Sequence, residues 1–177
     1  MHINHVFQIT MKKYFFTLVV SLASLITMSA QEIRYQGEVD LGASITTDGY
    51  QTGRPVANFR TIHGARVGDY LFAGLGFGAD WYFFDEGSSG DDSEVVVPVF
   101  LNLKGYYPVK DSLSPFISLD LGYGFGVTQS ISGEGGFVFS PAIGLQYRKF
   151  QFQIGYERQS ISGITLGSCN LRLGVVF

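Results

Sequence analysis

The sequence has few charged residues, a single cysteine and no segment with helical periodicity after residue 30. Only 15% of its 177 residues are charged, against about a quarter in typical soluble domains. The one cysteine, Cys169, excludes a disulfide within the chain, and we interpret it as a small apolar residue in a strand. The net charge is −3 and no basic patch stands out, so we expect no nucleic-acid partner.

Apolar and aromatic residues are abundant instead. Hydrophobic residues make up 46% of the chain and aromatic residues 15%, and there are 23 glycines. This composition is too apolar for a disordered chain and is rich in residue types that favour strands. The length corresponds to one domain.

The N-terminus has the pattern of an export signal. Met11-Lys12-Lys13 is followed by an uncharged, mostly apolar run over residues 14–26, and then by Ser29-Ala30. This order predicts a secretory signal peptide over residues 1–30, cleaved after Ala30, with Met11 as an alternative start of translation. The mature chain, residues 31–177, would keep ten basic and fifteen acidic residues, a net charge of −5.

The mature chain alternates between apolar and polar residues with the period of a β-strand. One face of each run carries bulky apolar side chains, and the opposite face carries small or polar ones. The pattern predicts eight strands, most longer than usual, at about residues 35–45, 58–67, 71–83, 97–104, 117–127, 137–147, 150–157 and 168–177. We therefore expect an all-β fold, an eight-stranded antiparallel up-and-down transmembrane barrel with its apolar face outward. The alternative is a soluble periplasmic barrel with that face inward.

The connections between these strands alternate in length. Those at about 46–57, 85–94, 129–136 and 160–164 are long, whereas those at 68–69, 110–114 and 148–149 are short. Outer-membrane barrels have long outer loops and short periplasmic turns. This predicts four outer loops and places both mature termini on the periplasmic side of the outer membrane.

Several segments carry a resemblance to a known family: Thr61–Gly64, Tyr70–Gly76, Val97–Asn102, Gly122-Tyr123, Ser140–Gly144 and the alternating Leu171–Phe177, which looks like the terminal strand signal of bacterial outer-membrane barrels. On these residues the mature chain resembles the small outer-membrane β-barrel family common in Bacteroidetes. The resemblance covers most of residues 31–177 and implies an outer-membrane barrel, without implying a chemical activity. In size the chain is also similar to the OmpA and OmpX barrels, by analogy of architecture alone.

The polar face carries charges of both signs, which we expect inside the barrel. We interpret them as a structural network, because unpaired buried charge is very costly; the alternative is a gated ion path. Lys104 is expected near Asp120, Glu157 near Arg172, and Arg172 near Glu38 or Asp40. The interior set is Glu38, Asp40, Arg66, Asp80, Lys104, Asp120, Glu157 and Arg172.

Three other features of the sequence are candidate sites. His63 is the only histidine of the mature chain and has no serine close to it in sequence, so we interpret it as an interfacial or packed residue. Glycines 74, 76 and 78, and again 122, 124 and 126, have nucleotide-loop spacing, but no helix follows them. The acidic segment Asp85–Glu94 lacks EF-hand spacing and leaves weak divalent-ion binding open. We therefore assign no catalytic, cofactor-binding or metal-binding residue.

These observations predict a protein that is not an enzyme. We expect a structural or surface-interaction barrel filled by its own side chains, because eight strands enclose little more space than side chains occupy. The alternatives are a narrow channel for ions or small solutes and, behind it, a lipid A-modifying enzyme. The expected partners are outer-membrane lipid and the barrel-assembly machinery, reached through the strand that ends in Phe177. We expect a monomer without a cofactor.

Overall fold

Eight long strands make up nearly all of the regular structure. The computed structural model describes residues 32–48, 52–83, 93–109, 112–128, 131–161 and 164–177. The predicted signal peptide and most of the acidic segment 85–94 lie outside these ranges. The strands are β1 (Ile33–Thr46), β2 (Pro55–Val67), β3 (Leu71–Tyr82), β4 (Glu94–Tyr106), β5 (Leu113–Gly126), β6 (Gly135–Tyr147), β7 (Phe150–Ile161) and β8 (Ile164–Val176).

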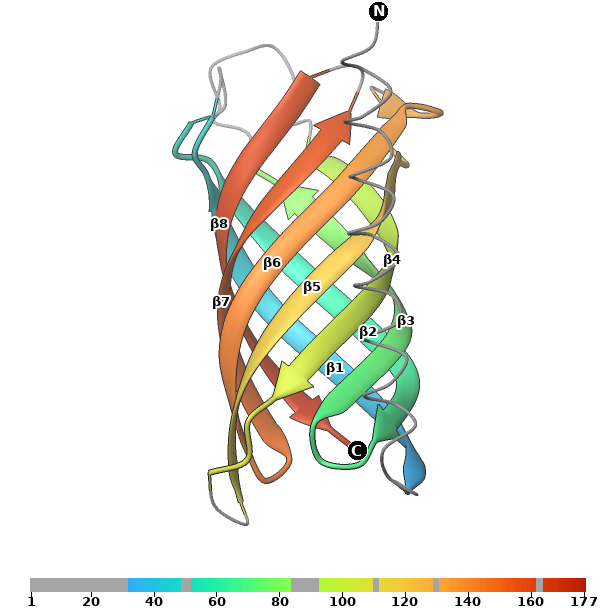
Figure 1. The fold of residues 1–177 in the computed structure, drawn as a ribbon. Coiled ribbons are helices and arrows are strands. Elements are labelled where there is room, and N and C mark those ends of the chain that lie inside the picture. The colour runs from blue at the N-terminus through green and yellow to red at the C-terminus, as the bar shows by residue number, and fades with distance from the viewer. Residues whose placement is uncertain (1–31, 49–51, 84–92, 110–111, 129–130, 162–163) are drawn as a thin grey trace, which may run out of the picture. The chain divides into compact units, whose positions relative to one another are not determined.

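The strands close into an antiparallel barrel (Figure 1). Each strand pairs with its neighbours in the sequence, and β1 pairs with β8. Leu41 lies opposite Leu173 in the closing pair. Gly37 and Phe177 extend this closure with two backbone hydrogen bonds, of 2.7 and 2.9 Å. Closure leaves no unpaired sheet edge, which a barrel needs if its wall is to face lipid.

The predicted fold is confirmed, but the strands run further than the sequence pattern indicated. β4 covers Glu94–Tyr106 instead of 97–104, and β7 and β8 extend to Ile161 and from Ile164. The connection expected at 160–164 is therefore mostly strand. The reason is that backbone pairing continues through polar residues near the loops, where apolar alternation has already stopped.

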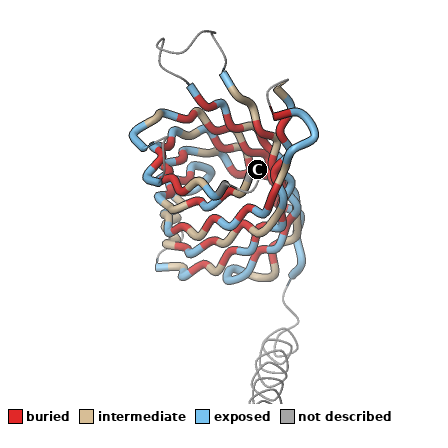
Figure 2. The backbone as a smooth tube through the Cα atoms, turned by 90° about the horizontal axis from the view of Figure 1, so that it is seen from above, coloured by how far each residue is buried: buried red, intermediate tan, exposed pale blue. Residues whose placement is uncertain are grey.

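Burial alternates along the strands, as Figure 2 shows in the sequence of buried and exposed positions. The bulky apolar residues predicted for the outer face do point outward. Large exposed apolar side chains come from seven of the strands, for example Leu41, Leu75, Leu101, Ile117, Ile143, Ile154 and Leu173. β2 differs, because the residues on that face include Ala57, Phe59, Thr61 and His63, of which only His63 is exposed. Cys169 also faces outward, within β8.

Two apolar clusters occupy parts of the interior. One lies towards the loop end, which is the end of the barrel where β1 connects to β2, β3 to β4, β5 to β6 and β7 to β8. It joins Val56, Tyr82, Val96 and Ile131, the last contributed by the connection between β5 and β6. The other lies along β2 to β5 and joins Ile62, Phe72, Phe100, Tyr106 and Phe116. Inward glycines make room for them: a Cβ atom on Gly76 would lie 2.5 Å from the Phe100 ring. The part of the chain that the structure describes contains no helix long and apolar enough to cross a membrane.

Candidate functional site

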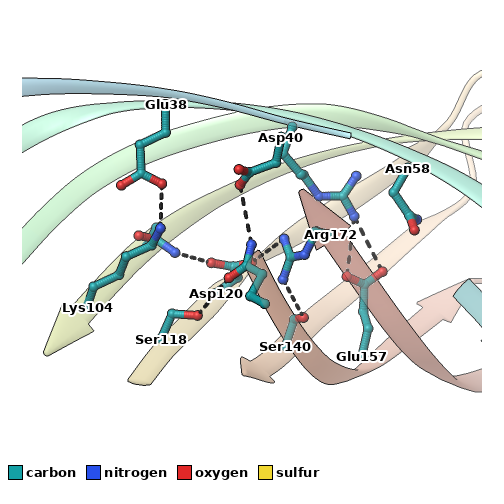
Figure 3. A network of polar contacts seen from close by, with 12 residues as sticks. Glu38, Asp40, Asn58, Lys104, Ser118, Asp120, Ser140, Glu157 and Arg172 are labelled. Carbon is teal, nitrogen blue, oxygen red and sulfur yellow. Dashed lines mark hydrogen bonds and ion pairs between the residues drawn. The ribbon is translucent and has the colours of Figure 1, made fainter. Parts of the chain in front are cut away.

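The remaining interior is a network of charged and amide side chains drawn from seven of the strands (Figure 3). Strand alternation places them there, because they stand at the inward positions of their strands. They are almost completely buried: Glu38 and Asp80 have no exposed surface, and Arg60 and Arg172 are 2% exposed. A water-filled path along these charges would leave them exposed, so this part of the lumen is filled by side chains.

Arg60 on β2 joins two carboxylates. Its Nη1 and Nη2 donate to both carboxylate oxygens of Asp80 on β3, at 2.7 and 2.9 Å. Nη2 also lies 3.3 Å from Glu157 on β7. Asn58 donates to Asp80 at 2.6 Å, and the Arg60 guanidinium lies over the Phe100 ring at 5.8 Å. Arg60 therefore ties the wall at β2 and β3 to the wall at β7.

Lys104 on β4 forms a second group, in which it pairs with Glu38 on β1. Lys104 also donates to Gln151 on β7 at 3.0 Å, and Gln151 in turn donates to Glu38 at 2.9 Å. The ammonium lies 4.8 Å from the centre of the Phe116 ring. The charge is thus held between a carboxylate, an amide and an aromatic face.

Arg172 on β8 forms a third group with Asp120 on β5, at 3.1 Å. Asn102 on β4 donates to the other oxygen of Asp120. Arg172 reaches Ser140 on β6 as well, at 3.4 Å. The two contacts of Arg172 span the lumen between strands that are not neighbours, so they resist separation of its walls.

Asp40 is the carboxylate of the network without an ion pair among the described residues. Its two oxygens accept hydrogen bonds from Gln151 at 2.6 Å and Gln153 at 3.3 Å. Five buried carboxylates thus share the interior with the cations Arg60, Lys104 and Arg172. No three His, Cys, Asp or Glu side chains within the described ranges come together as a metal site.

The structure places all eight sequence-predicted interior residues at buried positions, but several expected partners are different. Lys104 forms its ion pair with Glu38 instead of Asp120, and Arg172 forms its ion pair with Asp120. Arg172 nevertheless lies close enough to Asp40 and Glu157 to interact with both electrostatically, as expected. The sequence-based pairing assumed contacts between neighbouring strands, whereas these long side chains reach across the lumen.

Arg60 is the functional residue that the sequence reasoning missed. It stands two positions after Asn58 and two before Ile62, at an inward position of β2. The apolar alternation of β2 is weak, and this hid the residue. The sequence did indicate its inward position, because residues two apart in a strand point to the same side and Arg60 stands two residues after the polar Asn58. Arg66, in contrast, lies outside the three ion-paired groups, at the end of the barrel with the short turns.

His63 lies on the outer wall, as an exposed residue of β2. Its Nε2 is 3.0 Å from the Thr61 hydroxyl, and its Nδ1 is 2.6 Å from the Tyr35 hydroxyl. Its ring stacks on Tyr35 and meets the edge of Phe177. One hydroxyl partner of His63 is therefore a threonine two residues away, whereas the sequence offers no serine close to it. The group stands near the end that holds the start of β1 and the last residue of the chain.

Comparisons with known proteins show the fold and no closer relationship. No family model matches the sequence, and no curated protein matches it. Among solved structures, the outer membrane enzyme PagL is 13% identical with a TM-score of 0.58, covering 78% of this chain and 98% of PagL. Neisserial surface protein A is 9% identical with a TM-score of 0.60, covering 83% of this chain and all of that one. This chain has the fold of the small outer-membrane β-barrels.

Proposed function

We propose that this chain is exported and resides in the outer membrane, as a filled barrel with a structural or surface-interaction role. Its mechanism is burial of the apolar outer wall in lipid and display of four loops at one end. Membership of the Bacteroidetes family that the sequence resembles, and cleavage of residues 1–30, belong to this proposal. The chain would carry out no chemical reaction.

The observation that carries the proposal is the combination of an apolar outside and a charged inside. Leu41, Leu75, Ile117 and Ile143 are each more than 60% exposed, while Glu38 and Asp80 are completely buried. Water disfavours a continuous apolar wall of this kind, whereas hydrocarbon accommodates it. A soluble barrel would have the opposite distribution.

Exposed aromatic residues near the strand ends support a membrane position. Trp81 and Phe83 stand at the loop end. At the end with the short turns the exposed aromatic residues include Tyr35, Tyr70, Tyr107, Tyr147, Phe150 and Phe177. Aromatic side chains favour the two membrane interfaces. We assign the short-turn end, where β1 starts and β8 ends, to the periplasm.

The test is expression with the native signal, followed by fractionation and gel electrophoresis of unboiled and boiled samples. We expect a band in the outer-membrane fraction whose mobility changes on boiling. An epitope inserted in the connection at residues 47–54 should be labelled on intact cells, and one at Arg148-Lys149 should not. Recovery as a soluble periplasmic protein without a mobility change would overturn the proposal.

A narrow channel is the alternative function. The complete burial of Glu38 and Asp80 and the apolar cluster at the loop end count against it. In planar lipid bilayers we expect no single-channel events from the purified barrel, with a porin of known conductance as the positive control. Reproducible conductance steps that disappear on boiling the sample would favour the channel instead.

The proposed partners are lipid and the barrel-assembly machinery, and the proposed state is a monomer. Phe177 supports the second partner, because it is paired in β-fashion with Gly37 and remains 57% exposed. Phe177→Ser should slow assembly in cells while the purified chain still refolds in detergent. Cross-linking in membranes should yield the monomer band, and a dominant dimer would contradict that assignment.

A further inference from the structure

A polar pocket opens at the short-turn end of the barrel. It has a volume of about 540 Å³ and is bounded by the turns that follow β2, β4 and β6. Among the residues that the structure describes, it is lined by the guanidinium groups of Arg34, Arg66 and Arg148 and by the carboxylate of Asp69. Ser112, Ser114 and Gln146 add neutral polar groups. Among its described lining residues, positive charge therefore exceeds negative charge by two, in a chain whose net charge is negative.

Arg66 forms the buried part of this pocket. It is 8% exposed and lies over the Tyr106 ring at 4.1 Å. Its hydrogen bonds go to neutral acceptors: Gln36 Oε1 at 3.2 Å, Gln146 Oε1 at 3.4 Å and the Asp69 carbonyl at 3.0 Å. Its Nε has no partner, and no carboxylate of the described residues lies within ion-pair distance. A buried cation without a counter-charge is costly, so a bound anion would stabilise it.

The other two arginines of the pocket, Arg34 and Arg148, differ in whether a carboxylate of the described residues pairs with them. Arg34 pairs with Asp69 at 2.7 Å, and both groups are more than half exposed. Arg148 has no ion pair among the described residues, and its guanidinium lies 5.6 Å from the Tyr147 ring. Its backbone φ of 55° sets the tight turn between β6 and β7. Arg148 is thus a second cation without a carboxylate, at the same mouth as Arg66.

An apolar groove lies on the outer wall next to this pocket. It is lined by Gly105, Tyr107, Pro115, Ile117 and Leu145, among others. Tyr107 in the groove directly precedes Pro108 in the pocket, and Ser114 in the pocket directly precedes Pro115 in the groove. A molecule with a charged head and an apolar tail could therefore occupy both.

We infer that the short-turn mouth binds a phosphate group, with Arg66 and Arg148 as its principal cations. Guanidinium groups suit phosphate because their donors match pairs of its oxygens. The group can come from a phospholipid headgroup, whose acyl chain would lie in the groove, or from a soluble phosphate. The phosphate site is argued from the pocket alone and does not depend on the proposed function. Only the statement that the mouth faces the periplasm rests on that function.

The test is calorimetric titration of the full chain, purified in octyl glucoside from whichever cell fraction contains it. The two probes are inorganic phosphate and dihexanoyl phosphatidic acid, the second used below its micelle concentration. We expect saturable binding of at least one probe. Binding of both probes indicates that the site recognises the phosphate group that they share. Binding of the lipid alone indicates that contact of its acyl chain with the groove is also required. Absence of saturable binding by either probe overturns the inference.

Variants then locate the site. Arg148→Asn removes one cation and keeps a residue that tolerates positive φ, while Arg66→Gln removes the buried one. Each should weaken binding by about tenfold, the loss of one charge-assisted contact. Arg158→Gln, which removes an exposed charge near the loop end, should leave binding unchanged.

Folding and membrane residence are checked separately. A heat-dependent mobility shift verifies that each variant is folded, and Arg148→Asn remains informative if Arg66→Gln fails to fold. Equal weakening by Arg158→Gln would mean a general charge effect and would overturn the inference. Fractionation reports on membrane residence in a different experiment, so failure of the proposed function and failure of the phosphate site are distinguishable.

Discussion

The Arg60 guanidinium on β2 holds both carboxylate oxygens of Asp80 on β3, at 2.7 and 2.9 Å. The same group reaches Glu157 on β7 at 3.3 Å, and all three side chains are at most 6% exposed. Removing one partner of a buried ion pair leaves the others without compensation. Arg60 thus compensates two buried carboxylates at once.

Arg60→Met should therefore destabilise the barrel strongly, because it leaves Asp80 and Glu157 as unpaired buried charges. We expect a loss of about 3–5 kcal/mol in the free energy of unfolding. The measurement is urea unfolding in lipid vesicles, followed by the fluorescence of Trp81.

Two control variants accompany this measurement. One removes a charge at the surface, and the other removes all three interacting charges of the interior together. Arg158→Gln, at an exposed position of β7, should change stability by less than about 0.5 kcal/mol. The triple variant Arg60→Met, Asp80→Asn, Glu157→Gln should recover part of the loss, since neighbouring effects are not additive. A triple variant less stable than Arg60→Met alone would contradict the charge explanation.

The outer wall offers a test of lipid contact with two equally exposed residues. Leu75, within β3, is 68% exposed, and Tyr107, just after β4, is 73% exposed. In a bilayer, Leu75→Arg should cost about 2–4 kcal/mol and Tyr107→Arg at most about 1 kcal/mol, because the cost of an arginine depends on its depth. Unfolding in lipid vesicles measures both. Equal small effects would indicate that the wall does not face hydrocarbon.

Two glycines test how tightly the wall and the interior are packed. A Cβ atom on Gly122 would clash with the backbone of Val99 and Phe100, which cannot move aside without disrupting β4. Gly122→Ala should therefore cost about 1–3 kcal/mol. Gly105→Ala, whose Cβ would lie 3.5 Å from Ile117, should be neutral within about 0.5 kcal/mol. The reverse order of effects in thermal unfolding would contradict the packing argument.

The Thr61–His63 pair tests the assignment of no catalytic residue. A hydroxyl within 3.0 Å of an imidazole nitrogen is the arrangement of an activated nucleophile. The pair stands near the short-turn end, however, where the proposed orientation gives it no access to the outer leaflet. Mass spectra of lipid A should be the same for cells that express the wild type, His63→Phe or an empty vector. A modification that requires His63 would make this chain an enzyme.

The strands and their faces were predictable from the sequence for a physical reason. Successive side chains of a strand point to opposite sides, so a wall with an apolar outside and a polar inside imposes an alternation that can be read directly. β5 and β8, where this alternation is strict, had their faces correctly predicted. β2, where Thr61 and His63 interrupt the apolar face, hid Arg60.

The ion pairs were not predictable in the same way. Lys104 and Glu38 lie on β4 and β1, which are not neighbours, and they meet because the barrel brings opposite walls within reach of long side chains. Ile131, in the connection between β5 and β6, closes the apolar cluster at the loop end for the same reason. Nothing in the local sequence indicates which residue lies across a lumen.

The sequence by itself determined that the chain forms eight long strands with an apolar outside and a charged inside, because these properties follow from side-chain order along each strand. Only the tertiary structure decided which charges pair, that Arg60 links Asp80 to Glu157, and that Arg66 is left without a carboxylate beside Arg148. Those relationships depend on closure of the barrel, which sets distances between residues far apart in the sequence.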